Sequence, residues 1–499
     1  MIERMYDRRV PYREFAQQVR RFHRDLLLDM VGQQSARIQS DWVNGVHQRP
    51  GDPVRQFTLA AIARTALAEA MVFRAEEPVP YGALEKLCAL AIEVDQPDVP
   101  GEGVLFSPAM RRLMTRMSYQ QHFYYYGDLE DIVRTLSLLV EHDPTVRGLP
   151  TSGDWEAVLG VSLPVYMTIV FAVFVGASVR GGRFTDADIA EYAHAGAFGG
   201  ADAATARMVI DAHLAADLAT VQTIAKNDEN RGGVAGRELW LSNPLLSTPL
   251  ITDGTRYRLP ISPYLLHKIT PLGLFFTGST HFGDDFPRAL GDSFEKHLGP
   301  HLKLLEPYGA QVYPEITYGR DNKRTVDYIV VFDAFVLLVE AKGLRSTESA
   351  RIGDDTGLEI LAGRVQRARD QIDRTAGLIA EKIPELARIP ADRPVRGLVV
   401  TLEPIHLIDT FLFTDLLSAG SVESATASAH DLEQIIPTVI TLPNVGERLL
   451  QALTFHDPTP ASLDRAVKDL PRQRNPLAAA VWDRWSVVKG KSDPAPEAD

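Results

Sequence analysis

The spacing of apolar residues separates a helical first half of the chain from a second half in which strands and helices alternate. Four segments of the first half carry helical spacing or strong helix formers: 12–30, 57–73, 129–140 and 185–218. Thr185, just before Asp186 and Asp188, is the expected start of the last one. The pattern predicts a mostly α-helical N-terminal region.

Residues 157–179 contain no charged side chain, and the run is long enough to cross a bilayer. It also contains Gly160, Pro164 and Gly176, and a fully buried helix has the same apolar character on every side. We therefore expect a core helix and no membrane partner. A membrane-tethered protein is the alternative.

The pattern changes near residue 240. An Asp253-Gly254 pair lies between two apolar runs, which predicts a tight β-hairpin. The expected domains are a helical sensing or assembly region, a hairpin and connector, an α/β domain, and a disordered tail of polar composition. Their boundaries are 1–240, 241–283, 284–488 and 489–499.

The α/β domain is expected to open with an amphipathic helix over 284–298, because Phe286, Leu290, Phe294 and Leu298 recur every four residues. Gly299-Pro300 is the expected end of this helix. The elements that follow are strands at 310–318, 325–332 and 335–341, a helix at 362–382 and a strand at 395–402.

Two carboxylates are expected to meet within this domain. A two-residue turn at Asp333 and Ala334 places Asp327 directly opposite Glu340, with Lys342 on the same face. Both faces of this hairpin are otherwise apolar, as in a sheet covered on both sides. Facing carboxylates in such a setting repel each other and lose hydration, so a positive charge must compensate. A divalent cation held by oxygen ligands is the simplest candidate.

Composition and charge narrow the chemistry. The chain has 499 residues, 45% of them hydrophobic and 23% charged, with a formal net charge of −13. A nucleic-acid site must therefore be a local basic patch on an acidic protein. The single cysteine excludes a disulfide framework or a cysteine-based zinc site within one chain, and it fits a cytoplasmic protein.

A metal held by carboxylates suits phosphodiester hydrolysis, because it can polarise the phosphate and lower the pKa of a bound water. Carboxylate ligands favour Mg²⁺ or Mn²⁺ over zinc. Lys342 would orient the attacking water or stabilise the developing charge. Glu315, on the first strand, is a further candidate acid.

Asp327 followed by Glu340-Ala341-Lys342 resembles the Asp…Glu-x-Lys signature of the PD-(D/E)XK nuclease superfamily. The resemblance covers roughly residues 284–405, although Val326 stands where the family name has proline. It implies a restriction-endonuclease-like α-β-β-β-α-β fold. It also implies a catalytic, metal-binding role for Glu295 on the first helix, and a polar site residue on the second helix, either Gln366 or Gln371.

The same resemblance implies an Mg²⁺- or Mn²⁺-dependent endonuclease that acts on DNA rather than RNA. By analogy of architecture alone, it suggests a restriction or phage-defence effector and a homo-oligomer. A phosphate backbone would contact basic residues of this region. The expected contacts are Lys323, Arg324, Arg345, Arg364 and Arg367.

Two alternatives remain open at this point. Asp327, Glu340 and Lys342 could be surface charges at a strand end, and the basic residues could be solvated helix faces. The α/β domain would then be a catalytically inactive scaffold, whose helical half binds a partner or assembles. Retained charges at buried positions argue against an inactive scaffold, because such charges destabilise a fold without contributing to it.

Overall fold

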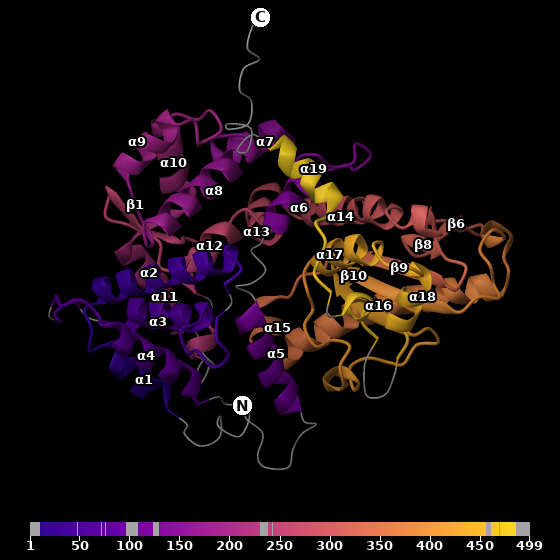
Figure 1. Ribbon diagram of the computed structural model, residues 1–499, viewed down its shortest axis with the longest axis horizontal. Coiled ribbons are helices and arrows are strands. Elements are labelled where there is room, and N and C mark those ends of the chain that lie inside the picture. The colour runs from indigo at the N-terminus through magenta and orange to yellow at the C-terminus, as the bar shows by residue number, and fades with distance from the viewer. Residues whose placement is uncertain are drawn as a thin grey trace, which may run out of the picture.

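The first half of the chain is helical in the computed structural model (Figure 1). The structure describes residues 10–46, 48–70, 72–74, 76–95, 108–122, 129–229, 238–241, 243–455, 461–468 and 470–485. The first eleven helices are α1 (Tyr12–Val19), α2 (Arg24–Val43), α3 (Gln56–Glu69), α4 (Tyr81–Glu93), α5 (Pro108–His122), α6 (Leu129–Leu139), α7 (Ser152–Leu159), α8 (Leu163–Val179), α9 (Asp186–His194), α10 (Ala203–His213) and α11 (Leu218–Glu229).

Strands and helices alternate in the second half. Its strands are β3 (Leu250–Thr252), β4 (Arg256–Arg258), β5 (Gln311–Pro314), β6 (Thr317–Tyr318), β7 (Lys323–Arg324), β8 (Tyr328–Val331), β9 (Val336–Lys342), β10 (Val395–Thr401) and β11 (Ser424–Ser428). Its helices are α12 (Ser262–His267), α13 (Pro271–Phe282), α14 (Asp285–Lys303), α15 (Glu348–Arg351), α16 (Asp355–Ala380), α17 (Ala429–Val439), α18 (Val445–Ala452) and α19 (Pro476–Arg484).

A five-stranded mixed sheet forms the centre of the second half, in the order β11-β10-β9-β8-β5. β9, β10 and β11 are parallel, whereas β8 is antiparallel to both β9 and β5. Val330 and Leu337 belong to the core shared with α14 and α17, and Ile329 and Leu338 to the core under α16. The sheet is covered on both sides, as the sequence predicted, and a helical region preceding an α/β domain is confirmed.

The helix expected over 185–218 begins where predicted but is two helices. The Thr185 side chain accepts a hydrogen bond from the Asp188 backbone and caps α9. Gly196, Gly199 and Gly200 then adopt positive φ angles, which no α-helix continues. Asp202 caps the start of α10 by accepting a hydrogen bond from the Thr205 backbone. The segment 12–30 is similarly divided between α1 and α2.

The apolar run at 157–179 forms the end of α7 and the whole of α8, whose residues Tyr166, Met167 and Val170 are buried in the core. None of the described helices is by itself long and apolar enough to cross a bilayer. Taken together, α7 and α8 reach that length and apolarity, but they meet at a 47° bend.

The two halves share elements across residue 240. The predicted hairpin is present as β3 and β4, with Thr252 paired to Tyr257. Its strands complete a four-stranded sheet with β1 (Arg183–Thr185) and β2 (Ala215–Asp217) from the first half. In the other direction, α5 packs on α15, and α6 packs on α14 and α19 (Figure 1). The boundary near residue 240 therefore remains a prediction, and the tail at 489–499 lies outside the described residues.

Helix α14 does not end at Gly299-Pro300 as expected, but continues to Lys303. A proline inside a helix costs about 3 kcal/mol, because it removes a hydrogen bond and crowds the preceding turn. Leu298 and Leu302, on either side of it, are buried, and each such side chain contributes about 1.5–3 kcal/mol. Packing of the helix against the sheet thus outweighs the local signal to stop.

Candidate active site

The hairpin of β8 and β9 brings Asp327 and Glu340 together in the predicted register. Tyr328 pairs with Val339 and Val331 with Val336, which leaves Asp333 and Ala334 in the turn. One step beyond Tyr328, Asp327 therefore lies opposite Glu340. The Ala341 backbone N–H donates to Asp327 Oδ2 at 2.6 Å, so the end of β9 holds this carboxylate in place.

Glu340 is a buried acid with one unsatisfied oxygen. Its side chain is 1% exposed, and its Oε1 accepts a hydrogen bond from the Lys342 ammonium group, which is 31% exposed. Its Oε2 is buried and accepts no hydrogen bond from the described residues. An orphaned carboxylate oxygen of this kind is unfavourable unless a cation or a proton occupies the position.

Both acids of the pair resist ionisation. Burial, followed by the negative charges of Glu340 and Glu295, raises the pKa of Asp327 well above its ordinary value. Burial also raises the pKa of Glu340, although Lys342 acts in the opposite direction. Because the two groups interact, they titrate as a pair. The positive charge of Lys342 is thus insufficient to offset the burial of Asp327 and Glu340.

Glu295 lies close to this pair, on α14. Its charge raises the pKa of both Asp327 and Glu340, and its side chain is 23% exposed. The Tyr328 hydroxyl donates to the Glu295 carbonyl at 3.0 Å and so fixes α14 over the start of β8. Gly299 permits this contact, because a Cβ atom at that position would lie 2.8 Å from the Tyr328 hydroxyl. The structure thus brings Glu295 close to the two predicted acids, and its role in a site stays a prediction.

Glu315 adds a fourth carboxylate beside Glu295. Burial raises its pKa, and the charge of Glu295 acts in the same direction, while Arg324 forms an ion pair with it at 3.2 Å. Glu295, Glu315, Asp327 and Glu340, with Lys342, are called the acid cluster below. Arg324 thereby lies at the rim of the acid cluster.

The two glutamines on α16 differ in position. Gln371 donates from Nε2 to the Thr325 carbonyl at 3.2 Å, two residues before Asp327. Gln366 instead bonds to Asp370 on its own helix and accepts from the Ser418 backbone at 2.9 Å. The structure therefore brings Gln371, and not Gln366, to the segment that carries Asp327.

The five basic residues predicted to contact nucleic acid lie in three different parts of the structure. Lys323 and Arg324 lie on β7 with side chains 63% and 70% exposed. Arg364 and Arg367 lie on α16, where Arg367 is exposed. Arg345 is different, because its guanidinium group stacks on the Phe275 ring of α13 and lines a separate cavity.

The structure also contains a buried charge network that the sequence analysis did not predict. His297, His301 and Glu433 bring potential metal-binding atoms within 4.8 Å of one another. The two histidines lie four residues apart on α14, a spacing that places them on one helix face. This signal was available in the sequence, but an expected helix end at residue 299 left His301 outside the helix.

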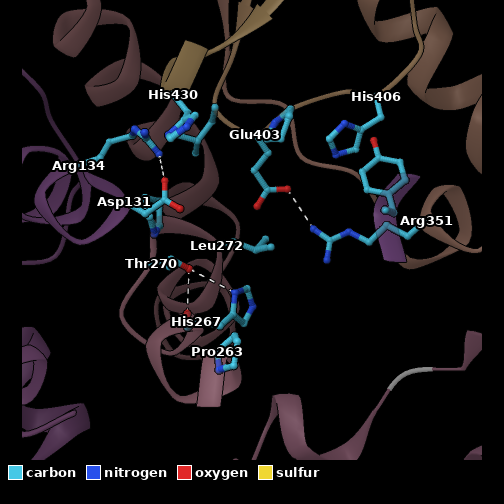
Figure 2. A pocket seen from close by; sticks show the side chains of 14 residues that line it. Asp131, Arg134, Pro263, His267, Thr270, Leu272, Arg351, Glu403, His406 and His430 are labelled. Carbon is cyan, nitrogen blue, oxygen red and sulfur yellow. Dashed lines mark hydrogen bonds and ion pairs between the residues drawn. The ribbon is translucent and has the colours of Figure 1, made fainter. Parts of the chain in front are cut away.

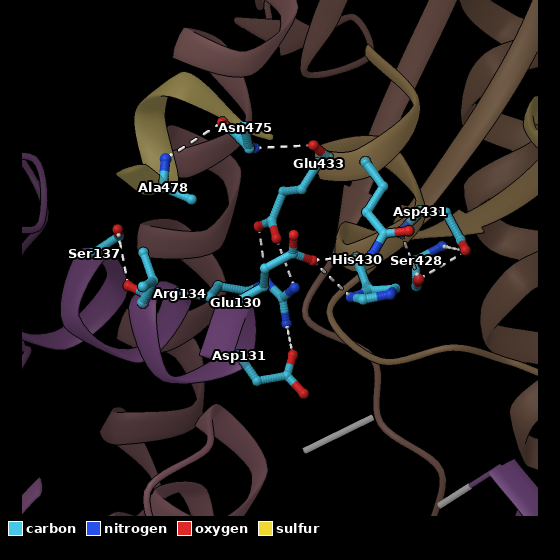
Figure 3. A network of polar contacts seen from close by, with 12 residues as sticks. Glu130, Asp131, Arg134, Ser137, Ser428, His430, Asp431, Glu433, Asn475 and Ala478 are labelled. Carbon is cyan, nitrogen blue, oxygen red and sulfur yellow. Dashed lines mark hydrogen bonds and ion pairs between the residues drawn. The ribbon is translucent and has the colours of Figure 1, made fainter. Parts of the chain in front are cut away.

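Hydrogen bonds already satisfy the Glu433 carboxylate, and Figure 3 shows those from Arg134. Arg134 Nε and Nη2 donate to its two oxygens at 2.8 and 2.6 Å, and His297 Nε2 lies 2.8 Å from Oε1. A metal ion at this position would have to displace the arginine. The carboxylate oxygens of the acid cluster, in contrast, are hard ligands of the type that Mg²⁺ and Mn²⁺ bind, and one of them, Glu340 Oε2, has no hydrogen-bond partner within the described ranges.

Searches against protein-family models, characterised proteins and solved structures find no match to this chain. Residues and geometry are therefore the basis for interpreting the acid cluster.

Proposed function

We propose that the acid cluster binds Mg²⁺ or Mn²⁺ and supports hydrolysis of phosphodiester bonds in DNA. The observation that carries the proposal is the pair of opposed acids, in which Glu340 Oε2 is buried and receives no hydrogen bond from the part of the chain that the structure describes. Buried acids with raised pKa values that are grouped closely together are more typical of functional sites than of structural ion pairs.

We propose a role for each residue that is consistent with its position. Asp327, Glu340 and Glu295 would hold the cation with their carboxylate oxygens. When bound, the cation offsets the phosphate charge and lowers the pKa of an attacking water. Lys342, which is partly exposed beside Glu340, would orient this water and stabilise the charge that develops on the phosphate. The water oxygen would bond to phosphorus as the bond from phosphorus to one sugar oxygen breaks; one proton of the water would move to that sugar oxygen, and the other would stay on the new phosphate oxygen.

The surroundings of the acid cluster are compatible with a nucleic-acid substrate. Arg324 and Lys323 lie on the exposed β6–β7 hairpin, and Arg324 contacts Glu315 at the rim. Arg364 and Arg367 add positive charge on α16, and we propose that these four residues contact the phosphate backbone. The order α14, β5, β8, β9, α16, β10 and the mixed sheet support a restriction-endonuclease-like fold for this domain.

The proposal is tested by incubating the purified chain with supercoiled plasmid and with single-stranded DNA, in Mn²⁺, Mg²⁺ or EDTA. We expect metal-dependent cleavage that decreases by about 10²–10³-fold in Glu340→Gln, in Asp327→Asn and in Lys342→Met, which is the effect of removing one electrostatic catalytic group. Glu359→Gln, an exposed glutamate on α16, is the matched control and should retain full activity.

Direct binding of Mn²⁺, measured by calorimetry, separates the possible outcomes. Glu340→Gln and Asp327→Asn should lose the Mn²⁺ site, whereas Lys342→Met should retain it and lose only cleavage. Absence of both Mn²⁺ binding and cleavage in the unmodified chain would contradict the proposal and favour an inactive scaffold.

A further inference from the structure

A cavity whose lining differs from that of the acid cluster lies between the two halves of the chain. This cavity of about 560 Å³ is enclosed by α3, α5, α12, α13, α15 and the segment that follows β9. This volume is within the range of cavities that bind small molecules, roughly 300–1,000 Å³. It shares Tyr119, His267 and Arg351 with a smaller cavity of about 80 Å³, in which Arg351 points toward Glu403 (Figure 2).

The wall of the larger cavity is strongly basic. Its lysine and arginine side chains come from three helices and two connecting segments: Arg64, Arg116, Lys268, Arg345 and Arg351. Among the wall residues that the structure describes, Glu348 is the one acid. Arg64 and Arg116 are 2% and 0% exposed, so these positive charges face the protein interior rather than bulk water. Buried guanidinium groups favour anions that accept several hydrogen bonds.

Two of these cations have no carboxylate in ion-pair contact among the described residues. Arg345 stacks on Phe275, and Lys268 donates to the Ser247 carbonyl at 2.9 Å. Burial lowers the pKa of Arg345 to about 10 and that of Lys268 to about 8. An anion bound in the cavity would relieve the cost of keeping both groups charged.

The rest of the wall is aromatic and apolar, which distinguishes the cavity from a plain phosphate site. Phe57, Tyr119, Tyr264 and Phe276 line it, and Phe276 is 56% exposed at its edge. A planar ring can stack on such side chains, as bases do in nucleic-acid-binding proteins. The cavity thus combines groups suited to phosphates with groups suited to a base.

We propose that this cavity binds a nucleotide, with its phosphates at Arg345 and Lys268 and its base against the aromatic wall. Arg345 is three residues beyond Lys342, so the nucleotide lies along the same segment that leaves the acid cluster. The proposal concerns binding alone and does not depend on the acid cluster being a nuclease. It gives Arg345 a role different from backbone contact with DNA.

The test is calorimetric titration of the full chain with ATP, with inorganic tripolyphosphate and with adenosine, all in EDTA. EDTA excludes metal-bridged binding at the acid cluster, and Glu340→Gln should bind ATP unchanged. We expect ATP to bind more tightly than tripolyphosphate, and adenosine to bind weakest. Lys268→Glu and Arg345→Gln should each weaken the binding of ATP by at least about tenfold, which is equivalent to about 1.4 kcal/mol of binding free energy.

Two further variants keep the result interpretable. Phe276→Ala, at the exposed edge of the cavity, should weaken the binding of ATP but leave the binding of tripolyphosphate unchanged. Arg288→Glu, a cation with a 78% exposed side chain on α14, is the matched charge control and should bind ATP normally. The proposal is overturned if ATP does not bind, if tripolyphosphate binds as tightly as ATP, or if Lys268→Glu and Arg345→Gln bind ATP as the unmodified chain does.

Discussion

Glu340 and Glu433 are both buried carboxylates in the second half of the chain, yet their surroundings differ. Glu433, with a side chain 5% exposed, receives both arms of Arg134 and a contact from His297. Glu340, 1% exposed, accepts a hydrogen bond from Lys342 at Oε1, whereas its Oε2 has no hydrogen-bond partner among the described residues. One carboxylate is fully matched with donors, and the other is left with an open position.

The pKa values follow this difference. Burial acts to raise the pKa of Glu433, but Arg134 and His297 more than offset it, and the pKa lies well below its ordinary value. Burial raises the pKa of Glu340, and Lys342 does not compensate. A buried charge matched within the fold contributes to structure, whereas one left unmatched indicates a missing ligand. This difference favours a structural role for the Glu433 network, and it supports the binding role that we propose for the acid cluster.

The largest expected effect is a loss of stability when the Glu433 network is broken. Arg134→Met leaves the Glu433 charge buried without its main partner, and we expect a loss of about 3–5 kcal/mol in unfolding free energy. Denaturant unfolding followed by tryptophan fluorescence measures it, because Trp482 and Trp485 lie on or next to α19, which packs on α6.

A double variant tests the cause of that loss. Arg134→Met combined with Glu433→Gln should be more stable than Arg134→Met alone, because the stranded charge is gone. Arg288→Met, on the exposed face of α14, should change stability by less than about 0.5 kcal/mol. If the double variant is no more stable than the single one, the network does not act through its buried charge.

The second expected effect is a gain of stability when a carboxylate of the acid cluster is neutralised. Because the folded-state pKa values of Asp327 and Glu340 are raised, the protonated forms favour folding. This contribution is fully present below the ordinary carboxyl range and is lost as pH rises through the folded-state values. In EDTA, Glu340→Gln should therefore stabilise the protein at pH 8 by about 1–3 kcal/mol, the cost of an unsatisfied buried group.

The same substitution should have little effect at pH 5, where the glutamate already carries a proton. Added Mn²⁺ should stabilise the unmodified chain at pH 8 and leave Glu340→Gln unchanged, since a ligand that binds only the folded state raises its stability. Thermal unfolding at both pH values measures these differences. A destabilising effect of Glu340→Gln at pH 8 would show that the acid is matched within the fold.

The two carboxylates also differ in how far the sequence reveals them. Asp327 and Glu340 are 13 residues apart, and buried alternation with a two-residue turn fixes their register. Glu433 and Arg134 are separated by 299 residues and meet only because α6 and α17 pack near α14. No local pattern encodes such a meeting.

Local signals were also misleading where packing opposed them. The Gly299-Pro300 pair indicates a helix end, but buried leucines on both sides extend α14 and bring His301 into the network. The basic cavity was equally inaccessible to sequence reading, because its cations come from elements as distant as α3 and the segment after β9. Of these cations, the sequence predicts a role only for Arg345, as a contact of the DNA backbone.

The smallest expected effect distinguishes the two glutamines of α16. Gln371 forms one hydrogen bond to the strand segment before Asp327, so Gln371→Ala should cost about 0.5–1.5 kcal/mol in stability. If it also helps to hold Asp327 in position, Mn²⁺ affinity and DNA cleavage should decrease by about tenfold, beyond the effect on folding. Gln366→Ala, which breaks contacts to Asp370 and Ser418 instead, is the matched control. Equal loss of cleavage in both variants would mean that Gln371 supports α16 in general and has no specific part in the acid cluster.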